Sequence, residues 1–322
     1  MKARIVLLVA IAALTVAGLL LAADNYLLRL ATTVGMYAAL ALSWNLIGGY
    51  AGYPSFATAA FFGLGAYASG ILQVGGLGFM WSWPLAGVLV ATFAGLLGGA
   101  ILHLRGHYFA IASLVVADVL RETTNTWTSL TGGGMGLNLP LLSLGSVDQQ
   151  AIFYFAAMAL MAIVAQLIAW KVDRARLGWA LRCVEQNEDA ALVIGVNAFR
   201  TKVLAFSLSG LIAGATGAVY ASWVTYIDPT DVYDSLLSVK PILMAMIGGV
   251  GTVFGPTIGA FIFLFLEELL WRNVLEFHAG LLGALIVVMV LFLPSGMSRL
   301  YQFRWTRWPS FKLAQRGKES GS

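Results

Sequence analysis

Apolar stretches long enough to cross a membrane follow one another along almost the whole chain. A membrane-spanning helix needs about 20 mostly apolar residues, because each backbone amide must find its hydrogen-bond partner inside the helix. The pattern therefore predicts an all-α, polytopic transmembrane bundle of about ten spans. The eighth stretch is short and glycine-rich, so a re-entrant segment is the alternative there. The stretches lie near 5–22, 28–48, 55–74, 83–103, 107–128, 151–170, 202–223, 236–250, 255–271 and 279–293.

The scarcity of charged side chains excludes other broad classes of protein. Only 11% of the 322 residues are charged, whereas 60% are hydrophobic. A soluble domain has about 25% charged residues, and a disordered chain combines low hydrophobicity with high charge. The single cysteine, Cys183, excludes a disulfide-stabilised secreted scaffold.

The positions of the basic residues predict the orientation of the bundle. With a cytoplasmic N-terminus, alternation places 104–106, 171–201 and 294–322 on the cytoplasmic side. Fifteen of the 19 Lys and Arg residues then lie there or at that boundary, whereas the outer loop 224–235 has three aspartates and no cation. This asymmetry follows the positive-inside rule, so both termini are expected in the cytoplasm. The basic and apolar N-terminus resembles a signal peptide, but further spans follow directly, so we expect an uncleaved first helix.

The chain is expected to comprise one transmembrane domain, 1–298, and a basic, aromatic cytoplasmic tail, 299–322. The tail interleaves Arg304, Trp305, Arg307 and Trp308. Beside a final span, such residues favour anchoring at the lipid interface over binding of nucleic acid.

A short helix is predicted inside the polar segment 171–201. Asn187 can cap its start, with Glu188 and Asp189 in the first turn, and Gly195 can end it. A helix of this length is unstable alone. It therefore packs either against a peripheral protein or on its own bundle.

Three charges fall inside the fifth apolar stretch. Asp118, Arg121 and Glu122 are three and four residues apart and so share one helical face. Charges within a membrane normally face a partner or a water-filled cavity. The face either borders a translocation path or forms a structural ion pair near the outer boundary.

The sequence has no pattern typical of an enzyme or a metal site. The glycine-rich segment 131–136 lacks the lysine and the strand-to-helix setting of a phosphate-binding loop. His103, His107 and His278 have no metal-ligand spacing. Glycines four residues apart, as in Gly210-x-x-x-Gly214, predict close helix packing.

Several motifs resemble those of one transporter family. Asp189-Ala190-Ala191-x-x-x-Gly195 resembles the Glu-Ala-Ala-x-x-x-Gly motif of ABC importer permeases, with Asp in place of the usual Glu. The segments 43–67, 104–112 and 127–136 resemble those of branched-chain amino acid permeases, most closely the M-type subunit. The resemblance covers about 40–294. Pro54, where a polar residue is usual, and Asp118, where Glu is usual, depart from the pattern.

The resemblance implies the type II importer fold and a permease subunit of a bacterial inner-membrane importer for Leu, Ile or Val. The implied partners are a second homologous permease, two cytoplasmic ATPases that bind ATP and Mg, a periplasmic binding protein and membrane lipid. The fifth span would border the path through Asp118, Arg121 and Glu122. Amides, urea or aromatic acids are alternative substrates, and an ion-coupled secondary transporter is an alternative class. The residues expected at the ATPase contact are Arg182, Glu185, Glu188, Asp189, Ala190, Ala191 and Gly195.

Overall fold

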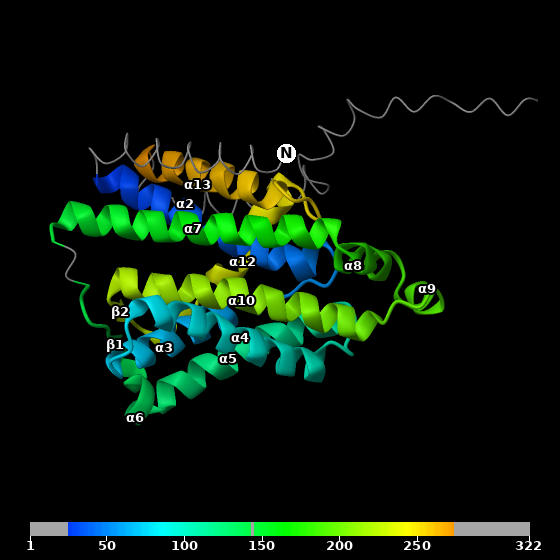
Figure 1. Cartoon of the computed structure of the whole chain (residues 1–322), viewed down its shortest axis with the longest axis horizontal. Helices are drawn as coiled ribbons and strands as arrows, with labels where there is room; N and C mark the ends of the chain where they lie inside the picture. The colour runs from blue at the N-terminus through cyan, green and yellow to red at the C-terminus, as the bar shows by residue number, and fades with distance from the viewer. Residues whose placement is uncertain (1–24, 143–144, 274–322) are drawn as a thin grey trace, which may run out of the picture.

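The computed structural model describes residues 25–142 and 145–273. The predicted spans 5–22 and 279–293, and the tail 299–322, lie outside the described residues. Eight of the ten predicted stretches coincide with helices in the described part (Figure 1). The helices are α2 (Asn25–Trp44), the π-helix η1 (Asn45–Gly49), α3 (Thr58–Val74), α4 (Phe79–Ile101), α5 (His107–Thr126), α6 (Thr128–Thr131), the 3₁₀-helix η2 (Gly133–Met135), α7 (Val147–Arg174), α8 (Arg176–Gln186), α9 (Glu188–Val193), α10 (Ala198–Val224), α11 (Pro229–Val232), α12 (Leu236–Gly248) and α13 (Gly255–Asn273).

Four described helical segments are long and apolar enough to cross a membrane: Asn25–Gly49, Phe79–Ile101, Val147–Arg174 and Ala198–Val224. Thr58–Val74 is a shorter apolar helix. The prediction of a helical bundle with several membrane-spanning helices is therefore confirmed, and the count of ten spans stays a prediction.

Two short strands depart from the expected all-α structure. β1 (Leu137–Asn138) and β2 (Tyr226–Ile227) pair antiparallel, with Leu137 opposite Ile227. They join the loop after α5 to the loop after α10, and the Tyr226 hydroxyl donates to the Met135 carbonyl at 3.1 Å. The glycine-rich segment 131–136 is therefore hydrogen-bonded into one end of the bundle.

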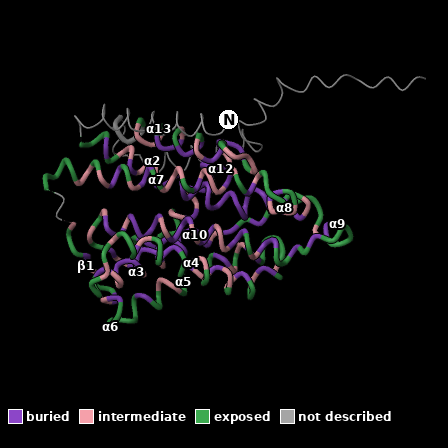
Figure 2. Tube along the Cα trace, viewed as in Figure 1, coloured by how far each residue is buried: buried purple, intermediate pink, exposed green. Residues whose placement is uncertain are grey.

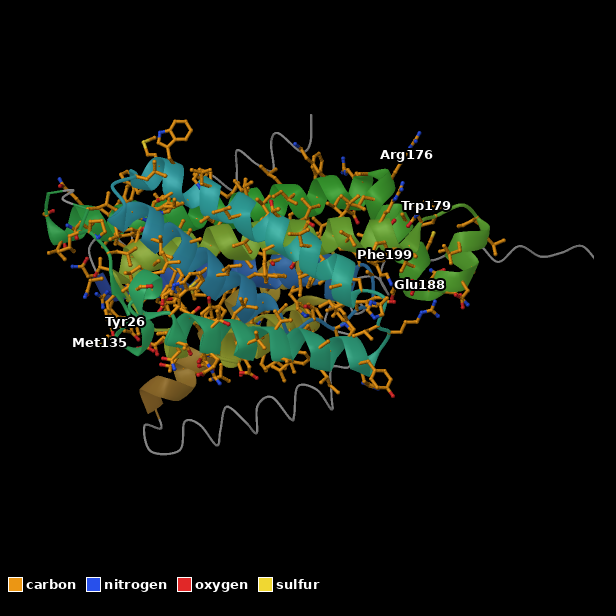
Figure 3. All side chains as sticks on the ribbon, turned by 90° about the horizontal axis from the view of Figure 1, so that it is seen from below. Tyr26, Met135, Arg176, Trp179, Glu188 and Phe199 are labelled. Carbon is orange, nitrogen blue, oxygen red and sulfur yellow. The ribbon has the colours of Figure 1, made fainter. Side chains whose placement is uncertain are left out.

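The predicted cytoplasmic and outer loops lie at opposite ends of the molecule. Viewed from below, Tyr26 and Met135 lie at one end, and Trp179 and Glu188 lie at the other (Figure 3). The same view places Arg176 beside Trp179. The basic segment and the acidic loop 224–235 are thus separated along the helix axes, as the charge pattern predicts.

The central helices are α2 and α10, whereas α4 and α7 lie at the periphery. In an 18-residue apolar stretch of each helix, 72% of the residues are buried in the segment Asn25–Gly49 and 61% in α10, but only 28% in α4 and in α7. Figure 2 shows buried residues following α2 and α10 through the bundle. Peripheral helices that are apolar on their exposed faces suit a lipid surround, because hydrocarbon does not penalise exposed apolar side chains as water does.

Glycine lets α10 approach its neighbours closely, as the four-residue spacing predicts. An added Cβ at Gly210 or Gly214 would collide with Ala94 or Val90 of α4. On its other side α10 meets α3, where an added Cβ at Gly217 would overlap the Phe62 carbonyl oxygen. These contacts fix α10 between α3 and α4.

The segment 171–201 is helical at both edges and is therefore less of a loop than predicted. α7 continues to Arg174 and α10 begins at Ala198. Between them lie α8 and α9, and the Asn197 side chain accepts from the Arg200 amide at 2.9 Å to cap α10. Asn187 likewise caps the start of α9, so the chain changes direction before α9 and before α10 at capped helix starts.

Candidate functional site

Local capping forms the short helix α9 at one end of the bundle. Asn187 Oδ1 accepts from the Asp189 and Ala190 amides, each at 3.0 Å, and so satisfies two donors at the helix start. Gly195 has a φ of +86°, which L side chains rarely adopt, and it directs the chain back toward α10. The predicted start and end of this helix are confirmed.

The exposed surface of α9 differs from the predicted one. Ala191 is only 1% exposed and faces the chain's own core, so it is not free to touch a partner. Asp189 and Ala190 are exposed. Three large apolar side chains are exposed too, Leu192, Val193 and Ile194, and Val193 is 88% exposed. We call these three residues the apolar tip.

Glu188 attaches α9 to the bundle through a buried lysine. The Lys202 side chain is 2% exposed, and its Nζ donates to Glu188 Oε1 at 2.8 Å. Nζ also donates to the Tyr53 hydroxyl at 2.9 Å and to the Leu102 carbonyl at 2.9 Å. The Tyr53 hydroxyl donates to Glu188 Oε2 at 2.6 Å. Both carboxylate oxygens are therefore paired.

These contacts set the charge state of Glu188. Partial burial disfavours the carboxylate, but hydrogen bonds from Lys202 and Tyr53 and the charges of Lys202 and Arg105 outweigh it, so the pKa of Glu188 lies below its ordinary value of 4.5. Arg105 Nε is 3.5 Å from Glu188 Oε2, and its NH2 donates to Asp189 Oδ1 at 3.2 Å. The two carboxylates in the first turn of α9, Glu188 and Asp189, are thus bound by the basic side chains of Lys202 and Arg105.

Arg182 and Glu185 do not belong to the exposed surface of α9. Arg182 pairs with Asp173 of α7, and its guanidinium lies 5.4 Å from the centre of the Tyr50 ring. Glu185 lies against Gly52, where an added Cβ would sit 3.0 Å from Glu185 Cγ. Both residues connect α8 to the chain that follows η1.

Sequence reasoning did not assign Lys202, Tyr53, Arg105 or Asp173 to this site. Only Lys202 carried a signal, because a lysine at the edge of an apolar stretch needs an anionic partner when it is buried. Tyr53 and Lys202 are 149 positions apart in the chain. No local pattern links them.

The charged face of α5 is open. Arg121 NH2 lies 3.3 Å from Asp118 Oδ1, and their side chains are 43% and 54% exposed. Glu122 lines a shallow hollow of about 660 Å³ with Val119, Thr123, Thr126 and Trp127. Within the described residues, Glu122 has no ion-pair partner. The three predicted residues therefore share a face that the described part of the chain leaves uncovered.

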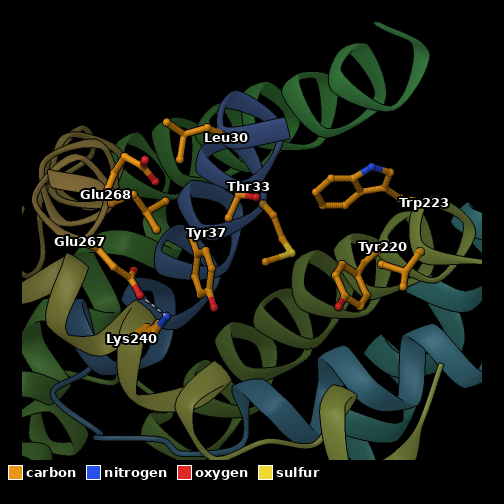
Figure 4. Close-up of a pocket in the computed structure, with 11 residues that line it drawn as sticks. Leu30, Thr33, Tyr37, Tyr220, Trp223, Lys240, Glu267 and Glu268 are labelled. Atoms are coloured by element: carbon orange, nitrogen blue, oxygen red, sulfur yellow. Dashed lines mark hydrogen bonds and ion pairs between the residues drawn. The ribbon is translucent and has the colours of Figure 1, made fainter. Parts of the chain in front are cut away.

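A second hollow of about 460 Å³ lies between α2, α10, α12 and α13 (Figure 4). Lys240 Nζ lies 2.7 Å from Glu267 Oε1 at its edge, and Tyr37 and Tyr220 line its wall. The other Glu267 oxygen is buried and has no hydrogen-bond partner among the residues that the structure describes. Lys240 is one of the four basic residues outside the segments predicted to be cytoplasmic. Its ion pair with Glu267 joins α12 to α13, which gives this lysine a structural role.

The apolar periphery and the glycine-packed centre define a multi-pass membrane protein. The chain belongs to the family described as "branched-chain amino acid transport system / permease component", whose model matches residues 26–292. The permeases of this family are membrane components of ATP-binding-cassette importers. The resemblance noted in the sequence is confirmed.

Characterised relatives differ in what their names say they carry. The high-affinity branched-chain amino acid transport system permease protein LivM of Escherichia coli K12 is 26% identical over 294 residues, which cover 83% of this chain and 69% of the relative. The autoinducer 2 import system permease protein LsrC of Enterobacter sp. 638 is 30% identical over 217 residues, covering 62% of this chain and 60% of the relative. No solved structure matches the chain.

Proposed function

We propose that this chain is the M-type permease subunit of an importer for branched-chain amino acids in a bacterial inner membrane, with both termini in the cytoplasm. The similarity to two LivM proteins along most of the chain favours Leu, Ile and Val as substrates. The LsrC relatives are named for the import of autoinducer 2, so relatives of this chain differ in the solute they are named for. Amides, urea or aromatic acids are the alternative substrates.

The observation that carries the proposal is the geometry of α9. An ATPase partner needs a rigid apolar surface that projects from the permease on the cytoplasmic side. The apolar tip, Leu192–Ile194, projects from a helix capped by Asn187 and held by Glu188. One cytoplasmic ATPase would dock there, and ATP and Mg would be bound by that partner and its twin on a second permease.

The open face of α5 is the proposed contribution to the translocation path. A second homologous permease would cover Asp118, Arg121 and Glu122 and complete a polar channel between the two chains. At the end that carries β1 and β2, exposed Trp127, Met135 and Leu141 offer a surface for a periplasmic binding protein that delivers substrate.

The test is uptake by the complete transporter reconstituted in liposomes. We expect leucine uptake to require the binding protein and internal ATP, to survive collapse of ion gradients by an ionophore, and to be inhibited by isoleucine and valine. Uptake that needs an ion gradient but no ATP would support a secondary transporter. Inhibition by amides or urea, and not by valine, would reassign the substrate.

A further inference from the structure

Residues 50–57, which join η1 to α3, form a segment without regular secondary structure that we call the strap. Tyr53 and Ser55 are buried, whereas Gly52 before them and Pro54 between them are exposed. Gly52 has a φ of +71°, which L side chains rarely adopt, and the ring of Pro54 fixes the φ of that residue. The Trp44 indole Nε1 donates to the Ser55 carbonyl at 2.9 Å and ties the middle of the strap to α2.

The first half of the strap contacts the segment that carries α9. The Tyr53 hydroxyl donates to Glu188 at 2.6 Å and accepts from Lys202 at 2.9 Å. Tyr50 stacks under Arg182, and Gly52 abuts Glu185. Because these contacts are direct, a displacement of α8 or α9 would displace residues 50–53 as well.

The second half of the strap is bound to α5 and α12. The Phe56 amide donates to Ser113 Oγ of α5 at 2.9 Å, and the Phe56 carbonyl accepts from Ser238 Oγ of α12 at 2.6 Å. Phe109, one turn before Ser113, packs edge-on against the Tyr53 ring at 5.5 Å between centroids. The strap is thus one polar connection between α9 and the open helix α5, in addition to the contacts that Arg105, just before α5, makes with Glu188 and Asp189.

The segment that connects Tyr53 to Phe56 is short and can be extended only slightly. Tyr53 and Phe56 are three residues apart, and three residues span at most about 10 Å. Pro54, which lies between them, has a fixed φ. The Tyr53 hydroxyl is hydrogen-bonded to buried Lys202, and the Phe56 amide to buried Ser113. A movement of Glu188 should therefore move Ser113, because the short segment between Tyr53 and Phe56 can change its length only slightly.

We propose that the strap couples α9 to α5, with Tyr53 and Ser113 as positioning residues through which ATPase-driven movement of α9 reorients the charged face of α5. The proposal rests on the ATPase-docking function proposed above. It concerns residues that touch neither nucleotide nor ATPase.

The test compares substrate transported per ATP hydrolysed in liposomes that contain the whole transporter and its binding protein. Tyr53→Phe removes one hydroxyl and keeps the ring, and Ser113→Ala removes the acceptor for Phe56. We expect each to lower the ratio about tenfold, the effect of losing one hydrogen bond within a charged or buried network. Because both break the same connection, the double variant should lose no more than the worse single variant.

Matched controls lie at the opposite end of the bundle. Tyr67→Phe removes a buried hydroxyl 3.5 Å from the Ile227 carbonyl, and Ser222→Ala removes a buried acceptor for Gln73 and Trp83. We expect both to keep the wild-type ratio. The proposal is overturned if the strap variants keep that ratio, if their losses multiply in the double variant, or if the controls lose as much.

Failure of the strap is distinguishable from failure of the docking function. Val193→Glu should release the ATPase from the permease. If Val193→Glu abolishes association while Tyr53→Phe keeps the transport ratio, only the strap is wrong. If the ATPase remains bound to Val193→Glu, the docking surface itself is wrong.

Discussion

Lys202 is nearly fully buried and donates to Glu188 Oε1 at 2.8 Å, so the first turn of α9 is fixed to the second turn of α10 by a largely buried ion pair. A six-residue helix has too few internal hydrogen bonds to persist alone. The ion pair between Lys202 and Glu188 is a tertiary contact that stabilises this short helix in its place. It therefore determines where the exposed apolar tip is held.

Removing the lysine should destabilise the permease more than removing both charges. Lys202→Met leaves Glu188 with Tyr53 and Arg105 only, and we expect the free energy of unfolding to fall by about 3 kcal/mol, because a buried charge loses its main partner. Glu188→Gln in the same chain should recover part of that loss. Thermal unfolding in detergent measures both. Arg121→Met, in an exposed pair, is the control and should cost no more than about 1 kcal/mol; equal losses in the two would contradict the assignment.

The attachment of α9 should depend on pH in one direction. Because the pKa of Glu188 is lowered in the folded state, its stabilising contribution is complete above its ordinary value of 4.5 and is lost as the pH falls through the lower, folded-state value. Protection of α9 from proteolysis should therefore decrease in acid below about pH 4.5. Glu188→Gln should lack this component, and an identical acid profile in the two proteins would refute the role of Glu188.

A charge on the apolar tip should separate the ATPase from the permease. Val193 is 88% exposed, so Val193→Glu costs the fold little but places a carboxylate in an apolar contact. We expect at least a tenfold loss of ATPase co-purification and of uptake, with the unfolding temperature unchanged. Val147→Glu, at the 75% exposed first position of α7 at the other end, is the matched control and should retain the ATPase.

The charged face of α5 should affect transport without affecting stability. Glu122→Gln and Asp118→Asn remove charges that are exposed in this chain, so we expect changes of less than about 1 kcal/mol in unfolding free energy. Uptake should fall several-fold if these groups line the path. Normal uptake in both variants would leave the face with a structural role alone.

The close approach of α10 and α3 should tolerate no side chain at Gly217. An alanine there would overlap the Phe62 carbonyl oxygen, so we expect Gly217→Ala to cost about 3 kcal/mol and to reduce the yield of folded protein. Gly99→Ala in α4 meets no atom within 4 Å and should leave the unfolding temperature unchanged or slightly raised. Similar yields of the two variants would show that the helices can separate at little cost.

Helix positions were predictable because the requirement for a membrane helix is local. About 20 apolar residues suffice, and the structure has helices at all eight predicted stretches that it describes. The start and end of α9 were predictable for the same reason, since Asn187 and Gly195 act on their immediate neighbours. The strands β1 and β2 had no such signal, because a two-residue pairing is made by loops that meet only in the folded chain.

The sequence by itself determined a glycine-packed membrane bundle with a short capped helix in its longest basic segment. The tertiary structure alone decided how that helix is used. It turned Ala191 inward, exposed Val193, and chose Lys202 and Tyr53 as the partners of Glu188. Tyr53 and Glu188 are separated by 135 positions, and burial of a lysine depends on which helices surround it. Contacts of that kind arise from packing, which no window of the sequence contains.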